Sequence, residues 1–126
     1  MLRGFLMLAA FFGFTGVGLG AFAAHVLKNL LSAEYLAIFH TGVTYQLIHT
    51  LALLGVALLA TQMPGRLVTW AGASFVIGIL LFSGSLYVLT LTGVSKLGIV
   101  TPFGGLAFLA GWLCLGLAAW RLPLTA

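Results

Sequence analysis

Residues 39–54 read FHTGVTYQLIHTLALL, a stretch that begins with polar side chains and continues into a long apolar segment. It lies inside an uncharged run over residues 35–65, and similar runs cover residues 4–24, 67–95 and 97–120. Each run reaches the roughly 20 residues with which an α-helix crosses about 30 Å of hydrocarbon. The sequence therefore predicts four membrane-spanning helices.

The composition indicates that lipid is the natural solvent of this chain. Of its 126 residues, 63% are hydrophobic and 5% are charged, whereas a soluble domain carries about 25% charged residues. The net charge of +4 would suggest nucleic acid in a soluble protein. Here the positive charges occur singly near the ends of the apolar runs, where they suit lipid headgroups. We expect membrane lipids as partners, and no nucleic acid.

The predicted fold class is all-α, an integral membrane four-helix bundle that forms one transmembrane domain over residues 1–126. The helices are expected near residues 2–25, 33–61, 67–91 and 101–120, with an interfacial segment before the second. In that segment Leu27, Leu30 and Leu31 are expected to dip into the headgroup boundary. Ser32 has the character of an N-cap for the second helix, and Thr101 that of a cap for the last, followed by Pro102.

Small residues spaced by four predict close helix packing, because they let a neighbouring backbone approach. The glycines expected at such contacts are Gly16, Gly20, Gly78 and Gly111. For Gly16 and Gly20, packing within the chain and a homo-oligomer interface both remain open.

Lysine and arginine counts give the topology. With both termini inside, the inner side holds Arg3, Arg66 and Arg121, and the outer side holds Lys28 and Lys96. This margin of one charge favours cytoplasmic termini.

The polar residues of the quoted stretch have a defined arrangement on a helix. Thr41, Tyr45 and His49 are spaced by four and share a face, with Gln46 beside them, while His40 points to the opposite side. Because polar groups in lipid are costly, Tyr45, Gln46 and His49 are expected to face the bundle interior.

Ser83 and Ser85 are plausible partners of these residues, which gives a candidate polar or ligand site formed by Tyr45, Gln46, His49, Ser83 and Ser85. One interpretation is a hydrogen-bond cluster that holds helices together. The other is a ligand site or proton path in which His49 titrates. Both remain open at this point.

A second polar group is expected at one membrane interface. It consists of His25, Lys28, Glu34 and His40. Metal or haem bound by His25, His40 or His49 is disfavoured, because His40 and His49 face apart and His49 lies deeper than the end of the first helix. No nucleophile–base pair or phosphate loop is visible, so we expect neither a cofactor nor an enzyme.

Four stretches together resemble a known family: GAFAAHVLK at 20–28, FHTGVTYQLIHTLALL at 39–54, LFSGSLYVLTLTG at 81–93 and TPFGGLAFLAGW at 101–112. They are similar, in this order, to the YgdD/YwdK-like family of small bacterial inner-membrane proteins, whose members carry a domain of unknown function and have distant mitochondrial relatives. The resemblance implies a four-helix, multi-pass protein of the bacterial inner membrane, and no established reaction, substrate or cofactor.

The resemblance also singles out recurrent polar positions. They map here onto His25, Lys28, Tyr45, Gln46, His49, Ser83, Ser85, Thr101 and Pro102.

Two functions follow as hypotheses. The first is a structural or accessory bundle component, either as a homo-oligomer or beside a partner membrane protein. The alternative is a transporter-like or channel-like protein, or a lipid or small-molecule binder, that uses the cluster around His49. A cavity lined by the candidate site residues would favour the alternative.

Overall fold

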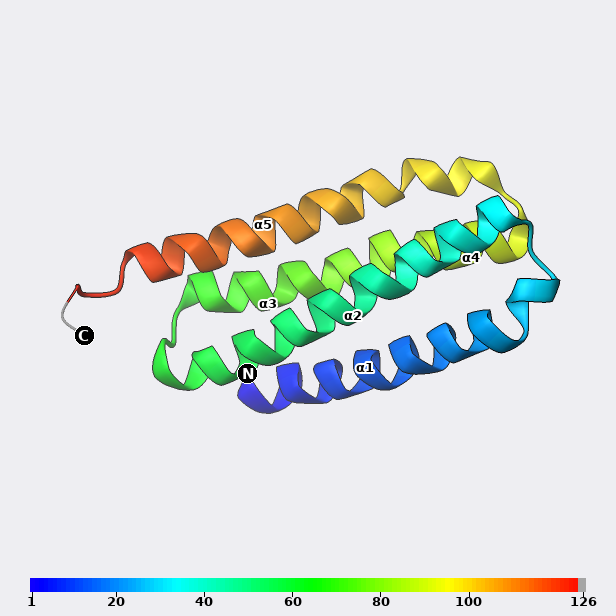
Figure 1. Cartoon of the computed structure of the whole chain (residues 1–126). Coiled ribbons are helices and arrows are strands. Elements are labelled where there is room, and N and C mark those ends of the chain that lie inside the picture. Colours follow the sequence, from blue (N-terminus) through cyan, green and yellow to red (C-terminus); the bar gives the residue numbers. More distant parts are fainter. Residues whose placement is uncertain (125–126) are drawn as a thin grey trace.

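Four long helical segments run side by side along the molecule and are joined at its two ends (Figure 1). The structure is a computed structural model and describes residues 1–124. Its elements are α1 (Leu2–His25), η1 (Leu27–Asn29), α2 (Ala33–Gln62), α3 (Arg66–Gly78), η2 (Ile79–Ser83), α4 (Gly84–Thr92), η3 (Ser95–Ile99) and α5 (Thr101–Trp120). The predicted all-α fold with four helices long and apolar enough to cross a membrane is confirmed.

The third membrane-length segment contains a feature that the sequence did not predict. α3 and α4 are joined without a break by a π-helical turn, η2. Beside it, a Cβ added to Gly104 of α5 would lie 2.3 Å from the backbone nitrogen of Phe82. The widened turn therefore meets the backbone of α5 at a position that only glycine can occupy without displacing main-chain atoms.

The helices are not equivalent in their packing. α1 packs mainly on α2, and α5 packs mainly on α3 and η2, so α2 and the α3–α4 segment form the centre of the bundle. One apolar core lies toward the end that holds the α2–α3 turn and is built around Phe12, Leu53 and Phe75. A smaller core, with Phe39 at its centre, lies toward the opposite end. The polar residues of α2 lie between the two.

The loop before α2 differs in part from the expectation. Leu30 is 71% exposed, but Leu27 is only 2% exposed and packs in the smaller core with Ala23 and Phe39. The prediction that Leu27 dips into the headgroup region was wrong, because the short helix η1 turns it inward. The Ser32 cap is confirmed, since its hydroxyl accepts a hydrogen bond from the Tyr35 amide at 3.1 Å.

The cap predicted for α5 was also wrong. Val100 occupies the position before the helix, and Thr101 is already its first residue. The Thr101 hydroxyl lies 2.6 Å from that of Ser85 instead. A hydroxyl that could have closed the end of α5 therefore ties this helix to α4.

The four glycines expected at helix contacts all lie against neighbours within the chain. A Cβ on Gly16 would lie 2.6 Å from Leu47, and one on Gly20 would lie 3.4 Å from Val43, both on α2. Gly78 and Gly111 lie against aromatic rings, Phe108 at 2.3 Å and Phe75 at 2.5 Å from the added Cβ. The face of α1 that carries Gly16 and Gly20 is thus the face that packs on α2.

Candidate functional site

α2 carries polar side chains on two different sides near the middle of its length. Gln46 is directed toward α1 and α4, and His49 toward α3 and α5. The exposed fractions are 3% for Gln46 and 4% for His49. Both residues therefore lie inside the bundle, but they belong to different sets of contacts.

The Gln46 amide links three helices. Its Nε2 group donates to the carbonyl of Phe12 and to the hydroxyl of Thr15, both at 2.9 Å, and its Oε1 accepts from the Tyr87 hydroxyl at 2.6 Å. The Phe12 carbonyl can only accept, so the amide orientation follows from its partners. This is the most connected polar side chain of the bundle interior.

His49 has both ring nitrogens hydrogen-bonded. Nδ1 lies 2.8 Å from the Tyr45 carbonyl, and the Trp112 indole donates to Nε2 at 3.0 Å. A carbonyl only accepts and an indole N–H only donates, so the ring is neutral with its proton on Nδ1. The imidazole also stacks on Phe108, with a centroid separation of 3.7 Å and an interplanar angle of 12°.

The two serines form hydrogen bonds with groups other than Tyr45, Gln46 and His49. Ser83 donates to the Gly42 carbonyl at 2.7 Å, and Ser85 bonds the Phe82 carbonyl and the Thr101 hydroxyl. Neither serine contacts the side chain of a polar α2 residue through a hydrogen bond. The five candidate residues therefore do not form one cluster in residues 1–124.

The structure brings together Tyr45 and His49 at a groove of about 580 Å³. The groove lies between α2 and α5, over η2, and its walls include Phe82, Phe108 and Trp112. The Tyr45 ring is 41% exposed and lies 4.6 Å from the ring of Phe82. Tyr45 is thus less buried than expected, because it forms a wall of the groove and not part of the closed interior.

The Tyr45 hydroxyl differs from the other polar groups that line the groove, those of His49 and Trp112, which are hydrogen-bonded. It makes no hydrogen bond to any group within residues 1–124, whereas every buried side-chain nitrogen or oxygen in that range has a partner. The groove therefore contains one free hydrogen-bonding group in otherwise apolar surroundings.

The interfacial residues lie at the end of the bundle that holds η1 and η3 (Figure 1). His25, Lys28, Glu34 and His40 are all exposed. Within residues 1–124 no three histidine, cysteine, aspartate or glutamate side chains gather in a group able to hold a metal ion.

Sequence reasoning did not identify the main partners of the candidate residues. Tyr87, Thr15 and Trp112 complete the contacts of Gln46 and His49. Their position within long apolar runs was the available signal, but their partners depend on helix rotation.

Comparison with known proteins identifies the family. Residues 19–105 match the family described as a protein of unknown function, DUF423. The chain is 47% identical over 116 residues to the UPF0382 membrane protein YwdK of Bacillus subtilis (strain 168). This alignment covers 91% of this chain and 94% of YwdK. It is 42% identical over 120 residues to the UPF0382 inner membrane protein YgdD of Escherichia coli (strain K12), in an alignment that covers 95% of this chain and 92% of YgdD.

A third relative, a UPF0382 membrane protein of Haemophilus influenzae, is 44% identical over 117 residues and covers 93% of this chain and 94% of its own length. No solved structure gives a significant match. The resemblance found in the sequence is confirmed. This chain belongs to the DUF423 family and is a small membrane protein similar to YwdK and YgdD.

Proposed function

We propose that this chain is a non-catalytic protein that binds a lipid-soluble molecule with a hydrogen-bond-accepting oxygen, such as an ester or ketone, in the groove between α2 and α5. The observation that carries the proposal is the free Tyr45 hydroxyl in this groove. A hydroxyl without a partner is unfavourable in an apolar medium. An acceptor on a ligand would remove that penalty and fix the ligand's position.

The size and lining of the groove support a ligand of this kind. Its volume of about 580 Å³ lies in the range of roughly 300–1,000 Å³ typical of small-molecule sites, which are mostly apolar with few polar groups. It extends along α5 from Pro102 to Trp112, a distance of about 15 Å at the rise of an α-helix. Gly105 lies between these residues and leaves room along the floor.

The contacts of His49 favour binding over catalysis or proton transfer. A general base needs a free nitrogen, and both nitrogens of His49 are occupied by the Tyr45 carbonyl and the Trp112 indole. Gln46, Ser83 and Ser85 make helix–helix contacts away from the groove. The proposal is therefore the ligand-binding form of the alternative hypothesis, and the hydrogen-bond cluster has the structural role.

A photoactivatable fatty-acid methyl ester with a diazirine on its chain tests the proposal, with a diazirine alkane of equal length as matched probe. The ester should label groove residues such as Phe82 and Trp112. Tyr45→Phe should weaken ester labelling about threefold to tenfold, the range expected for one hydrogen bond, and leave alkane labelling unchanged.

A blocking variant provides the control for the groove itself. A Cβ on Gly105 would meet only Phe82, at 4.0 Å, so Gly105→Leu places its side chain in the groove, whereas Gly116 has no atom within 4 Å. Gly105→Leu should abolish labelling by both probes, and Gly116→Leu should not. Ester labelling that is equal in the wild type, Tyr45→Phe and Gly105→Leu would refute the proposal.

A structural or accessory role beside a second copy or another membrane protein is the second candidate. It is favoured by the exposure of α1, because only 17% of the most apolar stretch of that span is buried, the lowest share of the four spans, against 22% in the α5 span and 39% in the α2 span. Cysteine cross-linking in native membranes tests this role in a Cys114→Ser background, which removes the native cysteine. Phe14→Cys places the new cysteine on α1, and Phe103→Cys on α5 is the control. A discrete product from Phe14→Cys alone is expected, and equal yields at both positions would contradict it.

For location we propose the bacterial inner membrane with cytoplasmic termini. YgdD is named as an inner membrane protein, and the end of the bundle near the N-terminus carries Arg3, Arg66 and Arg121. Reporter fusions at the C-terminus test the orientation. A cytoplasmic fluorescent reporter should be active there, and a periplasmic phosphatase reporter should be inactive.

A further inference from the structure

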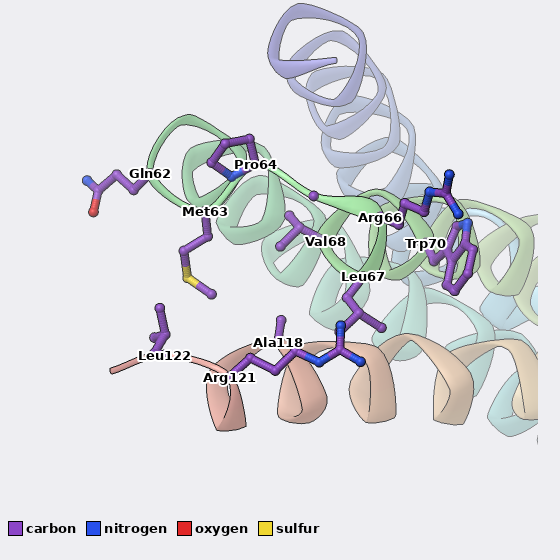
Figure 2. Close-up of a pocket in the computed structure, with 11 residues that line it drawn as sticks. Gln62, Met63, Pro64, Arg66, Leu67, Val68, Trp70, Ala118, Arg121 and Leu122 are labelled. Atoms are coloured by element: carbon purple, nitrogen blue, oxygen red, sulfur yellow. The ribbon is translucent and has the colours of Figure 1, made fainter. Parts of the chain in front are cut away.

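A second hollow, separate from the groove, lies at the end of the bundle where the α2–α3 turn meets the end of α5 (Figure 2). It has a volume of about 630 Å³. Met63, Leu67 and Ala118 supply apolar walls, and Arg66 and Arg121 lie at its rim. Figure 2 shows the Arg121 side chain extended along α5 toward Leu67.

The charge at this end is one-sided. Arg66 begins α3 and Arg121 follows the last residue of α5, and both are exposed. The only acidic side chain of the chain, Glu34, lies in the first turn of α2 at the opposite end of the bundle. Neither guanidinium therefore has a carboxylate partner within residues 1–124, and the pocket rim favours an anion.

The pocket joins this charge to an apolar surface at the ends of three membrane-length helical segments. Trp70, a residue type enriched at membrane–water interfaces, lies beside Arg66 in Figure 2. Guanidinium groups match phosphate oxygens in a two-point geometry. The first turn of α3 also has no side-chain cap, and its free amides add positive potential at the same rim.

We propose that this pocket binds an anionic glycerophospholipid, with the headgroup phosphate between Arg66 and Arg121 and part of an acyl chain against Met63 and Leu67. The apolar walls favour a lipid over free phosphate, which would leave them uncovered. The site is independent of the ligand groove, because it lies at the end of the bundle and shares no lining residue with it.

The test uses the full chain in nanodiscs of equal parts phosphatidylglycerol and phosphatidylcholine, and native mass spectrometry measures the lipids retained after release. The wild type should retain phosphatidylglycerol in preference to phosphatidylcholine. Removing one charge, as in Arg121→Gln, should lower that preference roughly fivefold, and Arg66→Gln/Arg121→Gln should lower it more than tenfold.

A matched control removes two charges from the other end of the bundle. Lys28→Gln/Lys96→Gln has the same net charge as the arginine double variant and should keep the preference of the wild type. An equal loss in both double variants would overturn the proposal, because it would show attraction by net charge alone. A wild type that shows no preference would overturn it as well.

Two further measurements keep the result interpretable. If the double variant loses helicity by far-UV circular dichroism, Arg121→Gln alone decides the outcome, since this residue is exposed at the end of α5. Inorganic phosphate at millimolar concentration should not displace phosphatidylglycerol from the wild type. Displacement would show a site for free phosphate and would refute the lipid assignment.

Discussion

The hydrogen bond between Gln46 and Tyr87 allows a quantitative test of the bundle interior. Gln46→Leu removes three interhelical bonds, and at about 0.6 kcal/mol each the loss of unfolding free energy is about 2 kcal/mol. Tyr87→Phe leaves the Oε1 atom of Gln46 without a donor, which should cost about 1 kcal/mol. Thr15 keeps a partner in either variant, since its hydroxyl also bonds the Phe11 carbonyl.

The double variant distinguishes coupling from simple addition. Once Gln46 is leucine, the Tyr87 hydroxyl has already lost its acceptor, so Tyr87→Phe should add nothing further. We expect a total loss of about 2 kcal/mol, not 3, and hence a coupling of about 1 kcal/mol. Unfolding by sodium dodecyl sulfate in bicelles, followed by circular dichroism, measures each variant.

The exposed Thr41 hydroxyl provides a control. Thr41→Val removes an exposed hydroxyl that bonds only within α2, and should change the unfolding free energy by less than about 0.5 kcal/mol. A double variant whose loss equals the sum of the two single losses would show that Gln46 and Tyr87 act independently. The assignment of this amide as the link between three helices would then be wrong.

The same unfolding assay checks three further expectations. Gly104→Ala should lower the free energy of unfolding by about 2 kcal/mol, because the new Cβ would meet the backbone of η2. The neighbouring Gly105→Ala should be nearly neutral, and equal effects of the two variants would contradict the close contact between α5 and η2. Ser32→Ala should cost about 1 kcal/mol through loss of the α2 cap, and Ser32→Asp should restore it; no rescue would argue against capping. Trp112→Phe should cost about 1 kcal/mol, because it leaves the Nε2 atom of His49 without a donor, whereas an unchanged midpoint would show that this bond is unimportant.

The helices could be predicted because the bilayer restricts the possible structures. A chain in lipid must satisfy its backbone hydrogen bonds internally, so long uncharged runs become helices. Their ends follow from local chemistry, as at Ser32 and at the Pro64–Gly65 turn. These are properties of short stretches, and the sequence displays them directly.

The partners of the polar residues could not be predicted in the same way. Which residue faces Gln46 depends on the rotation of one helix about its axis relative to another. The sequence placed Ser83 and Ser85 as partners of the α2 polar residues, but Ser83 bonds a backbone carbonyl and Ser85 bonds α5. Tyr87 takes the position beside Gln46 instead. Leu27 was misplaced for a similar reason, since its direction depends on the turn made by η1.

The π-helical turn η2 has a consequence for how this chain tolerates changes of length. Such a turn holds one residue more than the regular helical path, and each residue of an α-helix advances the side-chain direction by about 100°. Deleting one residue from 79–83 would let α3 and α4 continue as a regular helix with Tyr87 still directed toward Gln46, because the wide turn absorbs the extra residue without changing the direction of the segments on either side. A relative one residue shorter in this segment could therefore keep all four membrane spans and the same interior contacts. A one-residue gap at 79–83 is therefore the length difference between family members that this bundle accommodates most easily.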